Sequence, residues 1–127
     1  MKKSIFLFLL LSTLVTACNG IAQGKLNPDQ FNSLLAKDKT VQLIDVRTPG
    51  EYASGHIVGS TNIDYNSPDF LDRMRTLDKN KPVALYCAVG GRSGNAATKL
   101  KELGFSKVYD LAGGTQAWNA KQLPLIK

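Results

Sequence analysis

Short apolar runs alternate along this chain with segments of helical periodicity, and this alternation constrains the fold more than any other feature. β-Branched and other apolar residues fill the runs at 41–46, 83–86 and 108–111, with a shorter run at 61–63. Helix patterns lie between and after them, at about 27–37, 68–76 and 96–103 and around Trp118. Strands that alternate with helices predict an α/β fold, a mostly parallel sheet with helices on both faces.

Cys87 ends one of these runs and opens a glycine-containing loop. A strand that stops there places the sulfur at the carboxyl edge of the sheet, where open α/β folds bind ligands. The N-terminus of the following helix favours an anion and lowers a thiol pKa from its free value of about 8.5. We therefore interpret Cys87 as a nucleophile rather than an inert strand cysteine. The residues expected to bind substrate are those that follow it, Ala88, Val89, Gly90, Gly91, Arg92 and Ser93.

Two side chains of this loop each have two interpretations. The Arg92 guanidinium can hold an anionic donor, or it can pair with a carboxylate such as Asp45 or Glu51. The Ser93 hydroxyl is expected to cap the next helix, and it can also reach the sulfur.

Composition and charge narrow the function. The 127 residues suit one domain, and 43% hydrophobic with 20% charged residues is ordinary for a globular one. The net charge is +6, but its basic residues are scattered, which argues against nucleic-acid binding. The single histidine, His56, is expected to be structural, and without a ligand cluster no metal site is expected. Trp118 is expected in the core.

The first seventeen residues are typical of an export signal. Lys2 and Lys3 precede an apolar segment of about 21 Å as a helix, too short to span a membrane. The small residues before Cys18 resemble the lipobox of bacterial lipoproteins, which implies cleavage there and a lipid on that thiol. Cys87 would then have no disulfide partner. The expected organisation is a signal at 1–17, a tether at 18–25 and one domain at 26–127. The expected location is the bacterial cell envelope, with the protein held on the periplasmic or outer-surface side.

Several segments together resemble the rhodanese-like domain family, in order and in spacing, over about 26–124. Five segments of this chain resemble the first signature of the family: Asp45-Val46-Arg47, Glu51-Tyr52, Gly55-His56-Ile57, Gly59-Ser60 and Asn62-Ile63. Later segments resemble the active loop and the C-terminal signature of the family: Tyr86-Cys87-Ala88-Val89-Gly90-Gly91-Arg92-Ser93, Leu103-Gly104-Phe105 and Leu111-Ala112-Gly113-Gly114 with Trp118.

The resemblance implies a three-layer fold with a central five-stranded sheet, and a sulfurtransferase that carries sulfane sulfur as a Cys87 persulfide. The donor would be thiosulfate or a persulfide, the acceptor a thiol or cyanide, and no cofactor would be needed. The chain departs from the family pattern at two places. Ala88 and Val89 stand where members acting on thiosulfate often have basic residues, and Gln122 stands where a glycine is usual.

Two other readings stay open. A non-catalytic persulfide carrier or a protein-binding module of this family would share the same sequence features. A cysteine phosphatase or arsenate reductase is the less favoured reading, because such enzymes place five residues between cysteine and arginine. Here four residues separate Cys87 from Arg92, a loop better sized for one sulfur atom.

Overall fold

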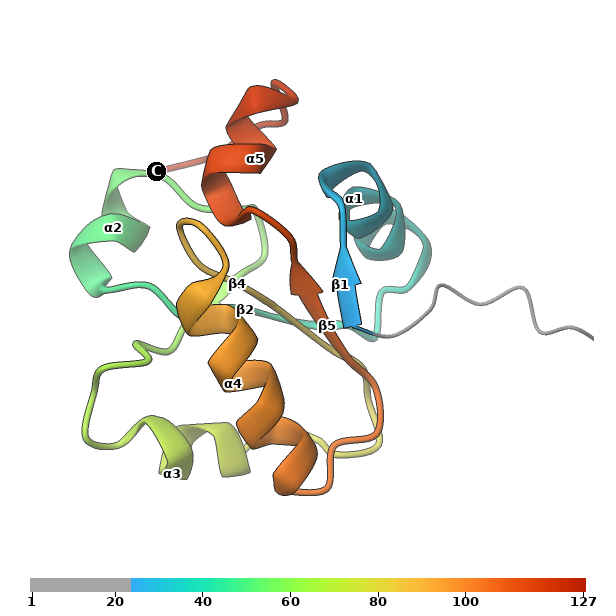
Figure 1. Ribbon diagram of the computed structural model, residues 1–127, viewed down its shortest axis with the longest axis vertical. Helices are drawn as coiled ribbons and strands as arrows, with labels where there is room; N and C mark the ends of the chain where they lie inside the picture. The colour runs from blue at the N-terminus through green and yellow to red at the C-terminus, as the bar shows by residue number, and fades with distance from the viewer. Residues whose placement is uncertain (1–23) are drawn as a thin grey trace, which may run out of the picture.

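A fully parallel five-stranded sheet runs through the centre of the molecule (Figure 1). This computed structural model describes residues 24–127; the predicted signal at 1–17, Cys18 and most of the predicted tether lie outside the described residues. The strand order is β1-β5-β4-β2-β3, which confirms the predicted α/β fold. The strands are β1 (Gly24–Leu26), β2 (Gln42–Asp45), β3 (Thr61–Asn62), β4 (Val83–Tyr86) and β5 (Val108–Leu111).

Helices cover both faces of the sheet and make two separate cores. One core lies under α3 and α4 and includes Met74, Leu85 and Leu100. The other lies under α1 and α5 and includes Phe31, Tyr86 and Trp118. No helix among the described residues is long and apolar enough to cross a membrane. The helices are α1 (Pro28–Lys37), α2 (Pro49–Ser54), α3 (Phe70–Arg75), α4 (Gly91–Glu102) and α5 (Gly114–Ala120).

The sheet register brings the ends of β2 and β4 together. Asp45 lies opposite Tyr86, the last residue of β4. Beyond it, the Val46 amide donates to the Tyr86 carbonyl at 3.0 Å. Strand β4 is flanked by β2 on one side and β5 on the other, so the loop after it opens at the centre of the sheet edge.

Two helices begin at a capping box followed by proline. Asn27 caps α1 and Thr48 caps α2, and in each case the side chain three residues later bonds back to the cap backbone. Proline occupies the first position of both helices, where a missing N–H costs nothing. The segment 48–50 therefore ends the strand region and also starts α2.

Strand β1 begins within the segment 18–25 predicted as a tether. Gly24 and Lys25 were assigned to the tether, but they pair with β5 in parallel register, Gly24 opposite Tyr109 and Lys25 opposite Asp110. Leu26 is buried, and the Lys25 ammonium bonds the Asp110 carboxylate at 2.9 Å. A three-residue edge strand is too short to show a period of two in the sequence, so only its pairing partner defines it.

Candidate active site

Cys87 lies at the carboxyl end of β4, directly before the loop that leads into α4. Its side chain packs in the core under α3 and α4, and the residue is only 1% exposed. Two donors point at the sulfur: the Gly90 amide at 3.0 Å and the Ser93 hydroxyl at 3.4 Å. The predicted position at the sheet edge is therefore the observed one.

These contacts favour the ionised form of the thiol. Burial alone raises the pKa of Cys87, because a charge is poorly solvated in the interior. Hydrogen bonds from the Ser93 hydroxyl and from the amides of Ser93, Gly90 and Val89 outweigh that effect. The pKa of Cys87 therefore lies below the usual value for a cysteine, and a thiolate is the nucleophilic form.

Ser93 does not cap α4, contrary to the expectation. Gly90, in the left-handed region at φ 112°, occupies the N-cap position, and the helix begins at Gly91. Ser93 is thus the third helical residue, and its hydroxyl also lies 3.3 Å from the Gly90 carbonyl. The left-handed turn at Gly90 starts the helix early and leaves the Ser93 hydroxyl for the sulfur.

The start of α5 holds the outer side of the loop. The Thr115 amide donates to the Cys87 carbonyl at 2.9 Å, and the Gln116 amide to the Ala88 carbonyl at 3.1 Å. Gly114 lies so close that a Cβ there would overlap backbone atoms of Cys87 and Ala88. With their carbonyls bound to α5, these residues are fixed in place, and the glycine pair after β5 is the sequence signal for this contact.

The Arg92 guanidinium forms a two-pronged ion pair with Glu51. Its two terminal nitrogens lie 2.8 Å from Glu51 Oε1 and 3.0 Å from Glu51 Oε2. This contact holds the pKa of Glu51 at about 2 and raises the pKa of Arg92. Asp45, the other carboxylate considered for Arg92, instead pairs with buried Arg47 at 2.6 Å.

Comparison with known proteins gives a family match over most of the chain. The Rhodanese-like domain profile matches residues 27–121. The chain belongs to the rhodanese-like family. It is 36% identical over 96 residues to thiosulfate sulfurtransferase GlpE of Pseudomonas entomophila, covering 76% of this chain and 84% of that one. It is 41% identical over 83 residues to YqhL of Bacillus subtilis, covering 65% of this chain and 64% of that one.

A solved structure shares the fold of this rhodanese-like domain. The rhodanese-related protein of Thermoplasma volcanium superposes with a TM-score of 0.71 at 29% identity, over 80% of this chain and 96% of that one. Both the sheet and its helices therefore match a known member of the family.

Gln122 stands where the family pattern usually has a glycine, and its backbone conformation is one that favours glycine. It adopts φ 58° and is the only non-glycine residue at positive φ among residues 24–127. That conformation costs an L-residue with a Cβ roughly 1–2 kcal/mol. The backbone of this rhodanese-like domain thus keeps a glycine-like turn without the glycine.

His56 and Trp118, both expected to be structural, are held by contacts within the domain. The His56 ring stacks on Tyr52 with centroids 3.7 Å apart, and His56 Nδ1 lies 2.9 Å from the Tyr52 carbonyl oxygen. Trp118 is 2% exposed, and its indole N–H donates to the Pro124 carbonyl at 3.0 Å.

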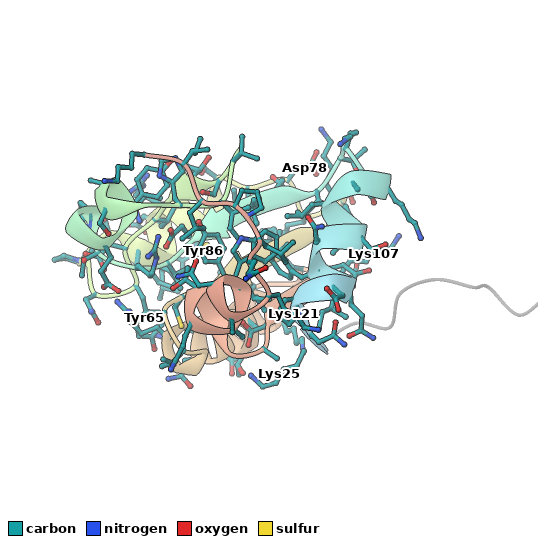
Figure 2. The ribbon with its side chains drawn as sticks, turned by 90° about the horizontal axis from the view of Figure 1, so that it is seen from above. Lys25, Tyr65, Asp78, Tyr86, Lys107 and Lys121 are labelled. Carbon is teal, nitrogen blue, oxygen red and sulfur yellow. The ribbon has the colours of Figure 1, made fainter. Side chains whose placement is uncertain are left out.

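The side chains around β4 support the strand that carries Cys87. Figure 2 shows Tyr86 in the interior of the molecule and Lys25 at its edge. The buried Tyr86 hydroxyl accepts from the Ile57 amide at 3.0 Å and lies 3.0 Å from the Ser60 hydroxyl. Burial raises the pKa of Tyr86 well above its usual value, so this group stays protonated.

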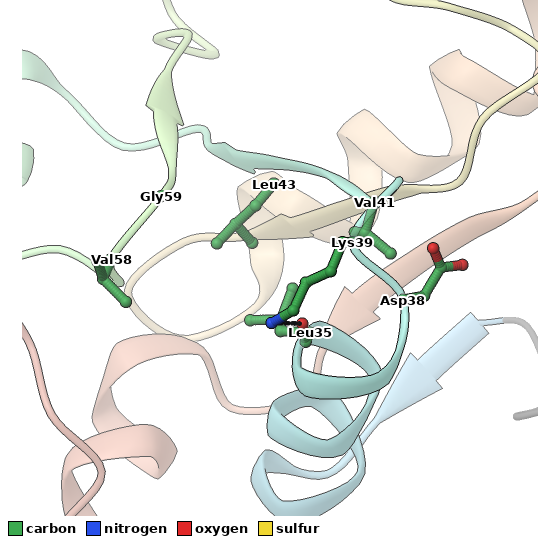
Figure 3. Close-up of a pocket in the computed structure, with 7 residues that line it drawn as sticks. All are labelled: Leu35, Asp38, Lys39, Val41, Leu43, Val58 and Gly59. Carbon is green, nitrogen blue, oxygen red and sulfur yellow. Dashed lines mark hydrogen bonds between the residues drawn. The ribbon is translucent and has the colours of Figure 1, made fainter.

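A surface hollow elsewhere in the domain does not reach the cysteine loop. It lies between the end of α1, the start of β2 and residues 58–59, and Lys39 Nζ lies 3.4 Å from the Leu35 carbonyl oxygen within it (Figure 3). None of its lining residues belongs to 87–93. In the described part of the chain no three His, Cys, Asp or Glu side chains gather as metal ligands.

Proposed function

We propose that this rhodanese-like domain is a sulfurtransferase that carries sulfane sulfur as a persulfide on Cys87. The observation that supports this most is the pair of donors on the sulfur, the Gly90 amide and the Ser93 hydroxyl. They stabilise a thiolate before reaction, and a persulfide anion has the same charge. The relative from Pseudomonas entomophila is named a thiosulfate sulfurtransferase, which agrees with this chemistry.

The reaction would proceed by two displacements at sulfur. The Cys87 thiolate attacks the outer sulfur of the donor, and the bond between that sulfur and the leaving group breaks. With thiosulfate the leaving group is sulfite, which takes the bonding electron pair and leaves Cys87 with one added sulfur and a negative charge. A thiolate or cyanide then attacks the outer sulfur and restores the Cys87 thiolate. No external oxidant or reductant is required.

The loop would stabilise the charge at each stage. The Gly90 amide and the Ser93 hydroxyl already point at the sulfur, so little reorganisation would be needed as charge moves outward. Bonds from α5 to the carbonyls of Cys87 and Ala88 hold the loop in that shape. Residues 88–93 thus serve the substrate mainly through their backbone.

Mass spectrometry tests the proposal directly. The protein is exposed to thiosulfate or to a small-molecule persulfide, digested, and the peptide that contains Cys87 is weighed. We expect the mass of one added sulfur on that peptide, which cyanide removes as thiocyanate. Loading without turnover would favour a carrier. No added sulfur with any sulfane donor would refute the proposal, and turnover of an aryl phosphate would favour a phosphatase instead.

We further propose that the protein is anchored to the cell envelope through Cys18. The support lies in the sequence alone, in the basic start, the short apolar segment and the small residues before that cysteine. Several acyl chains would be required, because one chain binds a membrane only marginally. Intact-mass analysis of protein from native membranes tests this, and an unmodified Cys18 would refute it.

A further inference from the structure

We propose that Glu51 is a specificity-determining residue that blocks the anion-binding face of Arg92 and so directs the site away from dianionic sulfur donors. This inference rests on the proposed sulfurtransferase function and names its substrate class. The favoured donors are persulfides or polysulfides with no more than one negative charge.

Arg92 is placed where it could hold an anion. It is the second residue of α4, directly after the loop that follows Cys87, and the charge of Cys87 contributes to raising the pKa of Arg92. A guanidinium binds a sulfonate or carboxylate best through two parallel N–H bonds. In this structure both prongs are already bonded to the two carboxylate oxygens of Glu51.

Glu51 is fixed in that position by its own helix. It is the third residue of α2, and its Oε1 accepts from the Thr48 hydroxyl at 3.1 Å and from the Thr48 amide at 3.3 Å. With a pKa of about 2, its carboxyl group is ionised at every physiological pH. A donor must therefore displace the Glu51 carboxylate to reach the fork of Arg92, which is the two terminal nitrogens of its guanidinium.

The remaining charge near Arg92 adds to this barrier. Asp64 also acts on Arg92 as a negative neighbour, alongside Glu51 and the sulfur of Cys87. Arg92 is thus bonded to the Glu51 carboxylate and has Asp64 and Cys87 as further negative neighbours. Two apolar residues lie next to the cysteine instead of cations: Ala88, and Val89, which is 64% exposed. We expect these negative neighbours to disfavour a dianion such as thiosulfate more than a persulfide with an apolar substituent, because the repulsion scales with the charge of the donor.

A matched pair of donors tests this inference. Thiosulfate carries two charges, and methanethiosulfonate presents the same outer sulfur with one charge and leaves as methanesulfinate. The second-order rate of persulfide formation on Cys87 is measured by mass for wild type and Glu51→Gln. Glutamine retains the Thr48 capping box while removing the charge. We expect the rate with thiosulfate to rise roughly tenfold and the rate with methanethiosulfonate about threefold. Removing the Glu51 charge relieves an electrostatic repulsion that is proportional to the charge of the donor, so the monoanion gains half the free energy that the dianion gains.

Asp64→Asn is the matched control. It removes one charge near Arg92 and retains the acceptor that the Asn66 amide uses, but it leaves Glu51 on the fork. We expect the rate with thiosulfate to rise about twofold. Equal gains for both donors in Glu51→Gln, or equal gains with thiosulfate in both variants, would overturn the inference. An unchanged thiosulfate rate in Glu51→Gln would overturn it as well.

A second measurement does not depend on sulfur transfer. Sulfate is an inert dianion, and its binding at the fork should protect Cys87 from alkylation by iodoacetamide. We expect sulfate to slow alkylation in Glu51→Gln and to have little effect on wild type. Sulfate protection without any persulfide formation would leave this role of Glu51 intact while refuting the proposed function. Sulfur transfer with no sulfate protection in Glu51→Gln would support the proposed function while refuting this role of Glu51.

Discussion

The Ser93 hydroxyl lies 3.4 Å from the Cys87 sulfur, six residues earlier in the chain. The contact exists because α4 begins at Gly91 and helical side chains tilt toward the N-terminus of their helix. Ser93 is therefore aimed back over the loop, and its hydroxyl is one cause of the low pKa of Cys87.

Ser93→Ala should raise the pKa of Cys87 and slow its reaction at neutral pH. One hydrogen bond to the thiolate is lost, worth about 1 kcal/mol, so alkylation by iodoacetamide at pH 7 should fall by roughly fivefold. The pH profile of alkylation should move to higher pH. Thr98→Ala, which removes a hydroxyl from the exposed side of the same helix, serves as the control. An unmoved profile in Ser93→Ala would show that the amides alone set the pKa.

Cys87→Ser should abolish sulfur transfer while the domain remains folded. Because Cys87 is buried in the core under α3 and α4, the change should also cost about 1 kcal/mol of unfolding free energy. Denaturant unfolding and persulfide formation are measured on the same sample. Transfer at the wild-type rate by a folded Cys87→Ser protein would rule out the mechanism.

Gly114→Ala should destabilise the protein and disrupt the cysteine loop. A Cβ at this position overlaps backbone atoms of Cys87 and Ala88, and φ is +56°, so backbone must move. We expect a loss of about 2–4 kcal/mol in unfolding free energy. Gly50→Ala is the control, because a Cβ there meets nothing within 4 Å. Equal stability of the two variants would show that the loop and α5 can separate freely.

Glu51→Gln should flatten the loss of stability in acid. The pKa of Glu51 is about 2 in the folded protein against an ordinary value of 4.5, so the ion pair stabilises the fold above pH 4.5. That contribution is lost as pH falls from 4.5 toward 2. Since Glu51 and Arg92 are 35% and 26% exposed, about 1 kcal/mol is the most we expect. Unfolding free energies measured across this interval should fall more steeply for wild type than for the variant, and parallel curves would contradict this.

Gln122→Gly should stabilise the protein by about 0.5–1 kcal/mol. The left-handed conformation at φ 58° penalises glutamine more than the added freedom of glycine costs in the unfolded chain. Lys121→Gly, one residue earlier at φ −85°, should instead destabilise it. Thermal unfolding of both variants checks that one change raises the stability and the other lowers it. Destabilisation by both changes would mean that the Gln122 turn is not strained.

Local patterns were enough to predict α1, α3, α4, α5 and the longer strands. The capping box from Asn27 to Gln30 marks where α1 begins, and Gly104, at φ +96°, follows the end of α4. The position of Cys87 at the end of a buried strand was equally clear from its neighbours. Strand β1 was missed because three residues carry no periodic signal, and its pairing with β5 spans most of the chain.

The sequence by itself determined the order of strands and helices, the cysteine at the end of β4 and the family to which the loop belongs. These depend on residues close together in the chain, whose spacing and turn chemistry act locally. Only the tertiary structure decided that Arg92 pairs with Glu51 and not Asp45, and that Ser93 faces the sulfur. The Ser93 contact depends on where α4 begins, at Gly91 rather than at Ser93 itself. The Arg92 pairing depends on where α2 meets the start of α4, and it joins residues distant in sequence, so its energy acts only once the sheet has brought the two helices together.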